Sequence, residues 1–226
     1  MAHQPAAANQ SSRAHVGLDA QAVVRAALRL IDAEGVQKFT IRRLSAELGV
    51  RGPTIYWHIG SKDALFEAVV TEVIGTMSVA TPVDAPWDER LRQFLSTARE
   101  HLLAHPGVME LIGSVHSSAL ARWGGEAFDI MIAAGFDGPA AATYARIAMT
   151  HATTTARSDA GVLRSSYMEP VPGAPRRFRV KPEVLDDDLG PVGQMTTYDL
   201  DEQHEIVTQI FVDGVRVAAE RHRAEH

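Results

Sequence analysis

The most constraining feature of the sequence is a pair of short helical segments that follow each other closely between residues 40 and 60. Thr40 is a good N-cap for a first helix with one apolar face, and Gly49 can end that helix. A second helix starts almost at once, with Pro53 in its first turn, and Gly60 closes it. Two short helices joined by a turn of about four residues form a helix-turn-helix, whose second helix can enter the major groove of DNA. The spacing alone is a weak signal, because many all-helical proteins contain such a corner.

The residue types of the second helix strengthen this interpretation. Thr54, Tyr56 and His58 can donate hydrogen bonds to phosphates or to base edges. Ile55 is placed to face inward, and Trp57 can pack or touch a thymine methyl group. An ordinary solvated helix face would instead be rich in Glu and Lys. The helix therefore favours contact with nucleic acid over a purely structural corner.

The charge of the chain is divided unevenly along its length. Residues 1–62 carry eight Arg and Lys against four Asp and Glu, whereas residues 63–226 carry 14 against 24. The formal net charge of -6 therefore conceals a basic N-terminal part. A basic head can attract phosphate while an acidic body keeps the chain off DNA elsewhere. Chance scatter of surface charge is the alternative explanation.

Helical periodicity through most of the chain predicts an all-α fold with a small head and a larger body. Residues 1–17 have no period and are expected to form a disordered tail. Residues 18–62 are expected to form a three-helix DNA-binding head, and residues 63–226 a ligand-binding and dimerisation body. No convincing alternating strand pattern appears, and the proline-rich segment of about 164–200 is expected to be irregular, either disordered or a cover.

Several classes of protein are disfavoured by what the sequence lacks. The chain has no cysteine, which excludes a disulfide framework, a thiolate nucleophile and Cys-ligated zinc. No signal-like N-terminus and no apolar run of about 20 residues is present, so we expect a cytoplasmic location without membrane contact. No Gly-rich phosphate loop, GxSxG elbow or paired-carboxylate motif stands out, so we expect neither enzyme activity nor a cofactor. His101 and His105 have the spacing of a metal clamp, but no adjacent Glu accompanies them and we expect no metal.

The stretch from Phe39 to Leu65, FTIRRLSAELGVRGPTIYWHIGSKDAL, resembles the DNA-binding head of the tetracycline-repressor (TetR) family. The resemblance implies that Arg42 reaches a base or a phosphate and that Lys62 holds a phosphate. It also implies a reading surface formed by Gly52, Pro53, Thr54, Tyr56, Trp57 and His58. Gly52 departs from the family pattern, because it lacks the side chain that members often use to read a base. The operator sequence of the best-known members therefore cannot be transferred to this chain.

The C-terminal segment IFVDGVRVAAE is similar to the closing helix of the family, which packs in a dimeric four-helix bundle. Gly214 on an apolar face permits the close approach of a second helix. A polar seam in the preceding long helix, rich in Thr and His, can lie at the same dimer interface or can line a ligand pocket, and we favour the interface. The expected dimer residues are His151, Thr154, Val207, Ile210, Phe211, Gly214 and Ala218. The alternative is a closing helix that packs only on its own body.

The large body indicates a function beyond dimerisation, since a dimerisation device alone could be far smaller. We expect it to bind a mainly apolar small molecule without metal. Candidate pocket walls are bulky or polar groups on the middle helices, although most could be plain core: Phe94, Met109, His116, Trp123, Phe128, Met131, Met149 and Thr153.

The residues and the resemblance together predict a one-component transcriptional repressor. It would bind double-stranded palindromic operator DNA as a homodimer and leave it when a small-molecule inducer binds. The alternatives are a helical small-molecule-binding protein and an enzyme, neither of which would bind DNA in a salt-dependent way.

Overall fold

The computed structural model of the chain describes residues 18–77, 82, 84–185 and 196–225. The tail expected over residues 1–17 and part of the proline-rich connection lie outside these residues. Helices dominate the described part, which confirms the predicted all-α class with a helix-turn-helix head and a larger helical body. No helix in the described part is long and apolar enough to cross a lipid bilayer.

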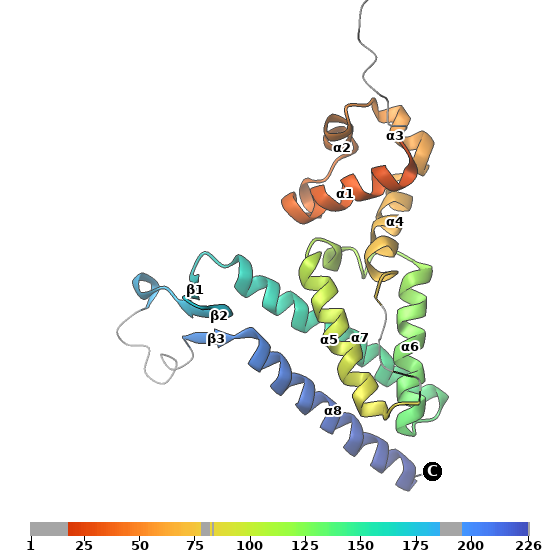
Figure 1. Cartoon of the computed structure of the whole chain (residues 1–226). Coiled ribbons are helices and arrows are strands. Elements are labelled where there is room, and N and C mark those ends of the chain that lie inside the picture. Colours follow the sequence, from red (N-terminus) through yellow and green to blue (C-terminus); the bar gives the residue numbers. More distant parts are fainter. Residues whose placement is uncertain (1–17, 78–81, 83, 186–195, 226) are drawn as a thin grey trace, which may run out of the picture.

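The head lies at one end of the molecule and consists of α1 (Ala20–Glu34), α2 (Ile41–Leu48) and α3 (Gly52–Ile59) (Figure 1). Asp19 caps α1 by accepting a hydrogen bond from the backbone N–H of Ala22, and Thr40 caps α2 in the same way, as predicted. Gly49 has a φ of 65°, a left-handed conformation that suits glycine and starts the turn into α3. A short 3-10 helix, Val36–Lys38, joins α1 to α2.

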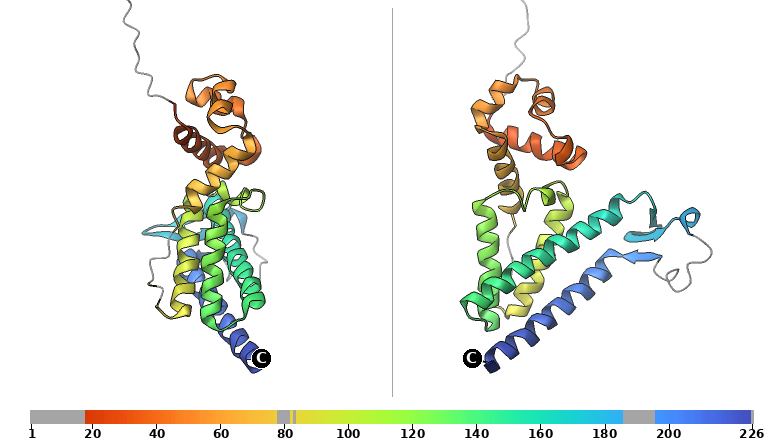
Figure 2. Two further views of the ribbon diagram at one scale, coloured as in Figure 1. Left: turned by 90° about the vertical axis from the view of Figure 1, so that its right-hand side faces the viewer. Right: turned by 180° about the vertical axis from the view of Figure 1, so that it is seen from behind.

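A single helix, α4 (Lys62–Ile74), runs from the head into the body (Figure 1). Ser61 caps it through a 3.0 Å hydrogen bond from the N–H of Ala64. The body consists of α5 (Trp87–Ala104), a 3-10 helix (Val108–Glu110), α6 (Ser118–Ala134), α7 (Gly138–Arg164) and α8 (Leu200–Glu225). The long helices α7 and α8 run side by side and extend past the other body helices (Figure 2).

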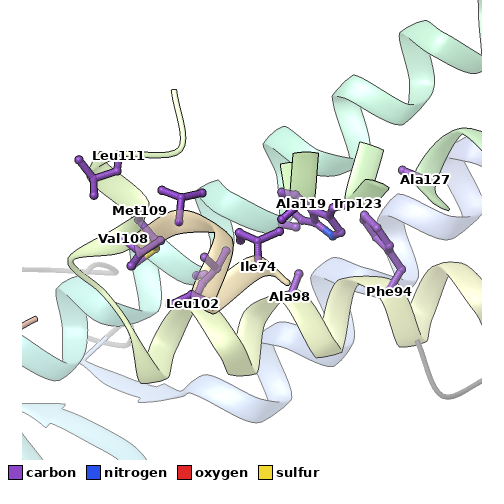
Figure 3. Close-up of a cluster of buried hydrophobic side chains, with 14 of the residues drawn as sticks. Ile74, Phe94, Ala98, Leu102, Val108, Met109, Leu111, Ala119, Trp123 and Ala127 are labelled. Atoms are coloured by element: carbon purple, nitrogen blue, oxygen red, sulfur yellow. The ribbon is translucent and has the colours of Figure 1, made fainter. Parts of the chain in front are cut away.

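The centre of the body is a packed apolar cluster to which α4, α5 and α6 all contribute (Figure 3). Phe94 of α5 stacks on Trp123 of α6 with ring centroids 5.5 Å apart. Ile74, at the end of α4, is 2% exposed and lies in the same cluster. Because burying each such side chain contributes about 1.5–3 kcal/mol, the lower end of α4 is firmly held in the body.

The connection between α7 and α8 contains a small antiparallel sheet, so the prediction of an irregular segment is wrong for this part. Its strands are β1 (Met168–Val171), β2 (Ala174–Val180) and β3 (Thr197–Asp199), in the order β1-β2-β3. A 3-10 helix, Pro182–Val184, follows β2. The sheet lies beyond the body, at the far end of α7 and α8 (Figure 1).

The sheet escaped prediction because its paired strands place oppositely charged residues opposite each other and carry no alternating apolar face. Arg177 of β2 binds Asp199 of β3 at 2.8 Å, and Arg179 binds Glu169 of β1 at 2.6 Å. Opposite charges on facing strands stabilise a sheet, but they leave no period-2 hydrophobic pattern in the sequence.

A buried ion pair joins three of the body helices. The Nε of Arg99 on α5 donates to Asp159 of α7 at 2.6 Å, and its two other nitrogens donate to Asp201 and to the carbonyl of Leu200 at the start of α8. Arg99 is 4% exposed and Asp159 is 8% exposed. Burial raises the pKa of Asp159, and the hydrogen bond from Arg99 opposes this rise. The pair therefore depends on both partners being present.

We expect Asp159→Ala to lower the free energy of unfolding by about 3 kcal/mol, because it leaves the buried guanidinium of Arg99 with only the half-exposed carboxylate of Asp201 as an ionic partner. Arg179→Ala removes an exposed ion pair of the small sheet and should cost less than about 1 kcal/mol. Urea unfolding followed by circular dichroism measures both changes. Equal losses in the two variants would contradict the stabilising role given to the buried pair.

Candidate nucleic-acid interface

The second helix of the head presents two aromatic side chains to solvent. Trp57 is 82% exposed and Tyr56 is 45% exposed, whereas Ile55 is fully buried, as the sequence predicted for that residue. The ring of Trp57 stands edge-on to that of His58, with centroids 4.7 Å apart. A large apolar ring in water is unfavourable, so this face of α3 is suited to being covered by a partner.

The start of α3 carries small side chains that leave room for a close approach. Pro53 and Thr54 are exposed, and Gly52 is partly exposed. A Cβ added at Gly52 would lie 3.9 Å from the hydroxyl of Ser45, which is an ordinary van der Waals contact. The fold therefore does not require glycine at this position.

Two of the predicted DNA contacts, Arg42 and Lys62, are exposed in the same head. Among the described residues Arg42 has no ion pair, whereas its neighbour Arg43 binds Glu34 at 2.9 Å and Glu47 at 3.1 Å. The hydrogen bond with Glu34, followed by that with Glu47, raises the pKa of Arg43. Arg43 is thus engaged within the head, and Arg42 is the arginine of α2 that can meet a phosphate or a base.

Lys62 lies at the start of α4, directly after the turn that closes α3. Its ammonium is 5.0 Å from the ring centroid of Phe66 and 5.9 Å from that of Phe39. These cation–π contacts restrict the side chain without neutralising its charge. The arrangement keeps a positive charge beside the second helix.

The candidate pocket residues lie in several environments. Phe94, Met109, Trp123 and Met131 are at most 5% exposed and belong to the body core. Phe128, Met149 and Thr153 are partly buried, and Thr153 donates to the carbonyl of Met149. His116 is exposed and lines a separate hollow near the start of α4. A ligand site on these residues stays a prediction.

The outer faces of α7 and α8 carry exposed apolar side chains. Ile206, Ile210 and Val217 recur at helical spacing on α8 and are 52%, 66% and 46% exposed. Ile147 of α7 is 45% exposed. A hollow of about 660 Å³ lies between the helices, lined by Thr143, Arg146, Ile147, Thr150, His151, Thr154 and Phe211.

The predicted dimer residues follow this same surface. Thr154, Ile210 and Gly214 are exposed, and His151, Val207, Phe211 and Ala218 are partly buried. The rings of His151 and Phe211 stack across the two helices at 4.4 Å. A Cβ at Gly214 would meet no atom within 4 Å, which leaves its face open to a second helix.

A separate buried polar cluster between α5 and α8, formed by Ser96, His204 and Thr208, was not predicted. The hydroxyl of Ser96 lies 3.2 Å from Nε2 of His204, while Nδ1 of His204 and Oγ1 of Thr208 are buried without a hydrogen-bond partner. Burial lowers the pKa of His204 to about 4, and the positive charge of Arg99 adds to this effect. Burial also lowers the pKa of His151. The only sequence signal was the four-residue spacing of His204 and Thr208, which places them on one helical face.

The two histidines that have the spacing of a metal clamp are engaged elsewhere. Nδ1 of His101 lies 2.9 Å from the carbonyl of Thr97, and Nδ1 of His105 lies 2.8 Å from a carboxylate oxygen of Asp32. Within the described ranges, no group of three or more His, Cys, Asp or Glu side chains could hold a metal ion.

Comparison with known proteins links the head to a bacterial family. Residues 23–69 match the model of bacterial regulatory proteins of the tetR family. An HTH-type transcriptional regulator of Saccharopolyspora erythraea is 28% identical over 116 residues, which make up 50% of this chain and 49% of that protein. The chain thus spans about half the length of this curated relative.

Solved structures match almost the whole chain in fold. ActR of Streptomyces coelicolor, solved in complex with (S)-DNPA, covers 90% of this chain and 100% of its own, with a TM-score of 0.66 at 22% identity. BioQ, solved with its double-stranded DNA operator, covers 89% of this chain and 99% of its own, with a TM-score of 0.63 at 21% identity. At such identities the likeness concerns the fold.

We expect the stability of the protein to fall as pH decreases from about 6.5 to about 4, because only the unfolded chain protonates His204 over that range. The loss from this residue should reach at most about 2 kcal/mol at pH 5. His204→Gln should remove this part of the pH dependence, and His116→Gln, at an exposed position, should keep it. The urea midpoints of unfolding at pH 7.5 and pH 5 test this expectation. If the difference between the two midpoints were the same in His204→Gln as in the unaltered protein, the expectation would be contradicted.

Proposed function

Because its head places the chain in the TetR family of transcriptional regulators, we propose that it is a repressor that binds palindromic operator DNA as a homodimer. The observation that carries the proposal is the exposed face of α3, with Trp57, Tyr56 and Thr54, on the second helix of a helix-turn-helix. We further propose that an apolar small molecule binds the body and releases the DNA. Its relatives are regulators, which favours this function over an enzyme, and we expect it to act in the cytoplasm, where operator DNA lies.

In the proposed complex α3 enters the major groove. Thr54, Tyr56 and His58 would reach base edges or phosphates, and Trp57 would cover a thymine methyl group. Lys62 would hold a phosphate beside the groove, and Arg42 would reach a base edge next to a phosphate. Because Gly52 has no side chain, this chain would lack the base contact that family members often make from that position.

The proposed dimer pairs the outer faces of α7 and α8 with those of a second copy. Support comes from the exposed isoleucines at 206 and 210 and from the open surface at Gly214. Exposed apolar side chains that recur along one helix face are unfavourable in water and suit an isologous two-fold contact. Two heads related by that axis would present their recognition helices to successive major grooves.

Release would follow from movement of α4. The C-terminal end of this helix, at Ile74, lies in the body core, and its N-terminal end directly follows α3. A ligand that shifts the body core would therefore change the separation of the two heads of the dimer. A hundredfold loss of operator affinity requires the ligand to prefer the released state by about 2.7 kcal/mol. ActR, which shares the fold, has been solved with a small molecule. We propose that the inducer binds in the body of this chain without a metal ion.

The experiment that tests the proposal is selection of bound fragments from genomic DNA, followed by affinity measurements at several salt concentrations. We expect a palindrome whose half-site centres lie about 34 Å apart. Lys62→Ala should weaken binding and flatten the salt slope by about one unit, and Tyr56→Ala should weaken binding to all sequences. Thr54→Ala and Arg42→Ala should change base preference.

Lys181→Ala provides a matched control, since it removes a positive charge next to the small sheet, outside the head, and should leave DNA binding unchanged. If the unaltered protein showed no salt-dependent binding to DNA, the proposal that it is a regulator would be overturned. A helical small-molecule-binding protein or an enzyme would then be favoured. If Thr54→Ala and Arg42→Ala changed neither affinity nor preference, the proposed docking of α3 would be wrong.

We expect Ile210→Arg to convert the dimer into monomers, because it places an unpaired charge at the centre of the proposed interface. Sedimentation velocity measures the change in mass, and binding to the palindrome should weaken with it. Asp129→Arg, which makes a charge change on an exposed position of α6, should leave the dimer intact. A fully dimeric Ile210→Arg would place the interface elsewhere.

A further inference from the structure

The head is joined to the body at two separate places. One is α4, which is covalently continuous and is also tied to the body by a 2.8 Å hydrogen bond between the hydroxyls of Thr71 and Ser117. The other is a contact between α1 and the loop that follows α5. A head held by one helix alone could pivot about that helix, so the second contact decides how far it can turn.

Asp32 of α1 makes the second contact with both of its carboxylate oxygens. One oxygen accepts a hydrogen bond from the backbone N–H of Gly107 at 3.1 Å, and the other lies 2.8 Å from Nδ1 of His105. The side chains of Asp32 and His105 are 21% and 35% exposed, so the pair is partly shielded from water. Such charge-assisted bonds are about twice as strong as bonds between neutral groups.

Gly107 brings the two segments into direct contact. A Cβ at this position would lie 2.6 Å from both the Cγ2 and the carbonyl oxygen of Ile31, a residue with no exposed surface. Its φ of -67° is open to any residue, so the reason for glycine is space and not backbone conformation. The loop therefore fits against α1 only when residue 107 has no side chain.

We propose that Asp32 is a positioning residue that fixes the rotation of the head on the body and makes the head sensitive to movement of α5. The inference rests on the proposed function, since the head is taken to be the part that binds DNA. His105 directly follows the last turn of α5, and Leu102 of that turn is buried in the body core. A displacement of α5 by a ligand therefore reaches Asp32 within one helical turn, along a route separate from α4.

The test measures the head–body distance directly and does not require DNA. Because the chain has no cysteine, Gln37→Cys in the head and Asp129→Cys in the body supply exposed, unique positions for spin labels. Pulsed electron paramagnetic resonance is recorded with excess unlabelled chain, so that most dimers hold one labelled copy. We expect one narrow distance distribution in the parent and a broader or shifted one in Asp32→Ala, His105→Ala and Gly107→Ala.

Matched controls separate this contact from general damage. Glu34→Ala removes a carboxylate two residues further along α1. The partner of Glu34 is Arg43, which lies within the head. His101→Ala removes a ring bonded within α5, and Gly113→Ala adds a methyl group where nothing lies within 4 Å. These variants should keep the narrow distribution. Asp32→Asn, which keeps an acceptor for Gly107 but loses the charge, gives an intermediate case if a larger change prevents folding.

Operator affinity provides the functional readout. Loss of the Asp32 contact should weaken it by about tenfold, the equivalent of 1.4 kcal/mol, while His101→Ala and Gly113→Ala should stay within about twofold of the unaltered protein. If the unaltered protein binds no DNA, the proposed function fails, and the distance measurement alone still decides the role of Asp32. An unchanged narrow distribution in Asp32→Ala and His105→Ala would overturn the inference.

Discussion

The packing of α4 is the contact on which the rest of the molecule depends. Leu65 is fully buried in the head, and Val69, Val70 and Ile74 are buried further along the same helix as it enters the body. One apolar stripe therefore continues the hydrophobic core of the head into that of the body. Any repacking of the body is transmitted along a rigid helix instead of being absorbed by a flexible linker, because interiors are close-packed and yield little.

The sequence predicted most reliably those features whose cause is local. The predicted cap at Thr40 satisfies the free N–H of Arg43, three residues further on, so a short stretch of sequence contains all the information. The inward position of Ile55 follows from helical spacing in the same way. The geometry of the head could therefore be anticipated almost residue by residue.

Features that join distant segments could not be predicted in this way. The pair between Arg99 and Asp159 links positions 60 residues apart, and the polar cluster at His204 joins α5 to α8. The charged residues of the small sheet have their partners on other strands, and its sequence carries no hydrophobic alternation. In each case the stabilising partner comes from tertiary structure, and a single sequence gives no register for it.

The open space at Gly52 has an evolutionary consequence. A Cβ added there meets only the hydroxyl of Ser45 at ordinary contact distance, so the backbone of the head leaves room for a side chain at this position. The same position faces the base pairs in the proposed complex. Affinity for a given DNA sequence and stability of the fold are thus governed by different atoms, and duplicated copies of such a gene can diverge in their targets by single substitutions without first acquiring a compensating mutation in the core.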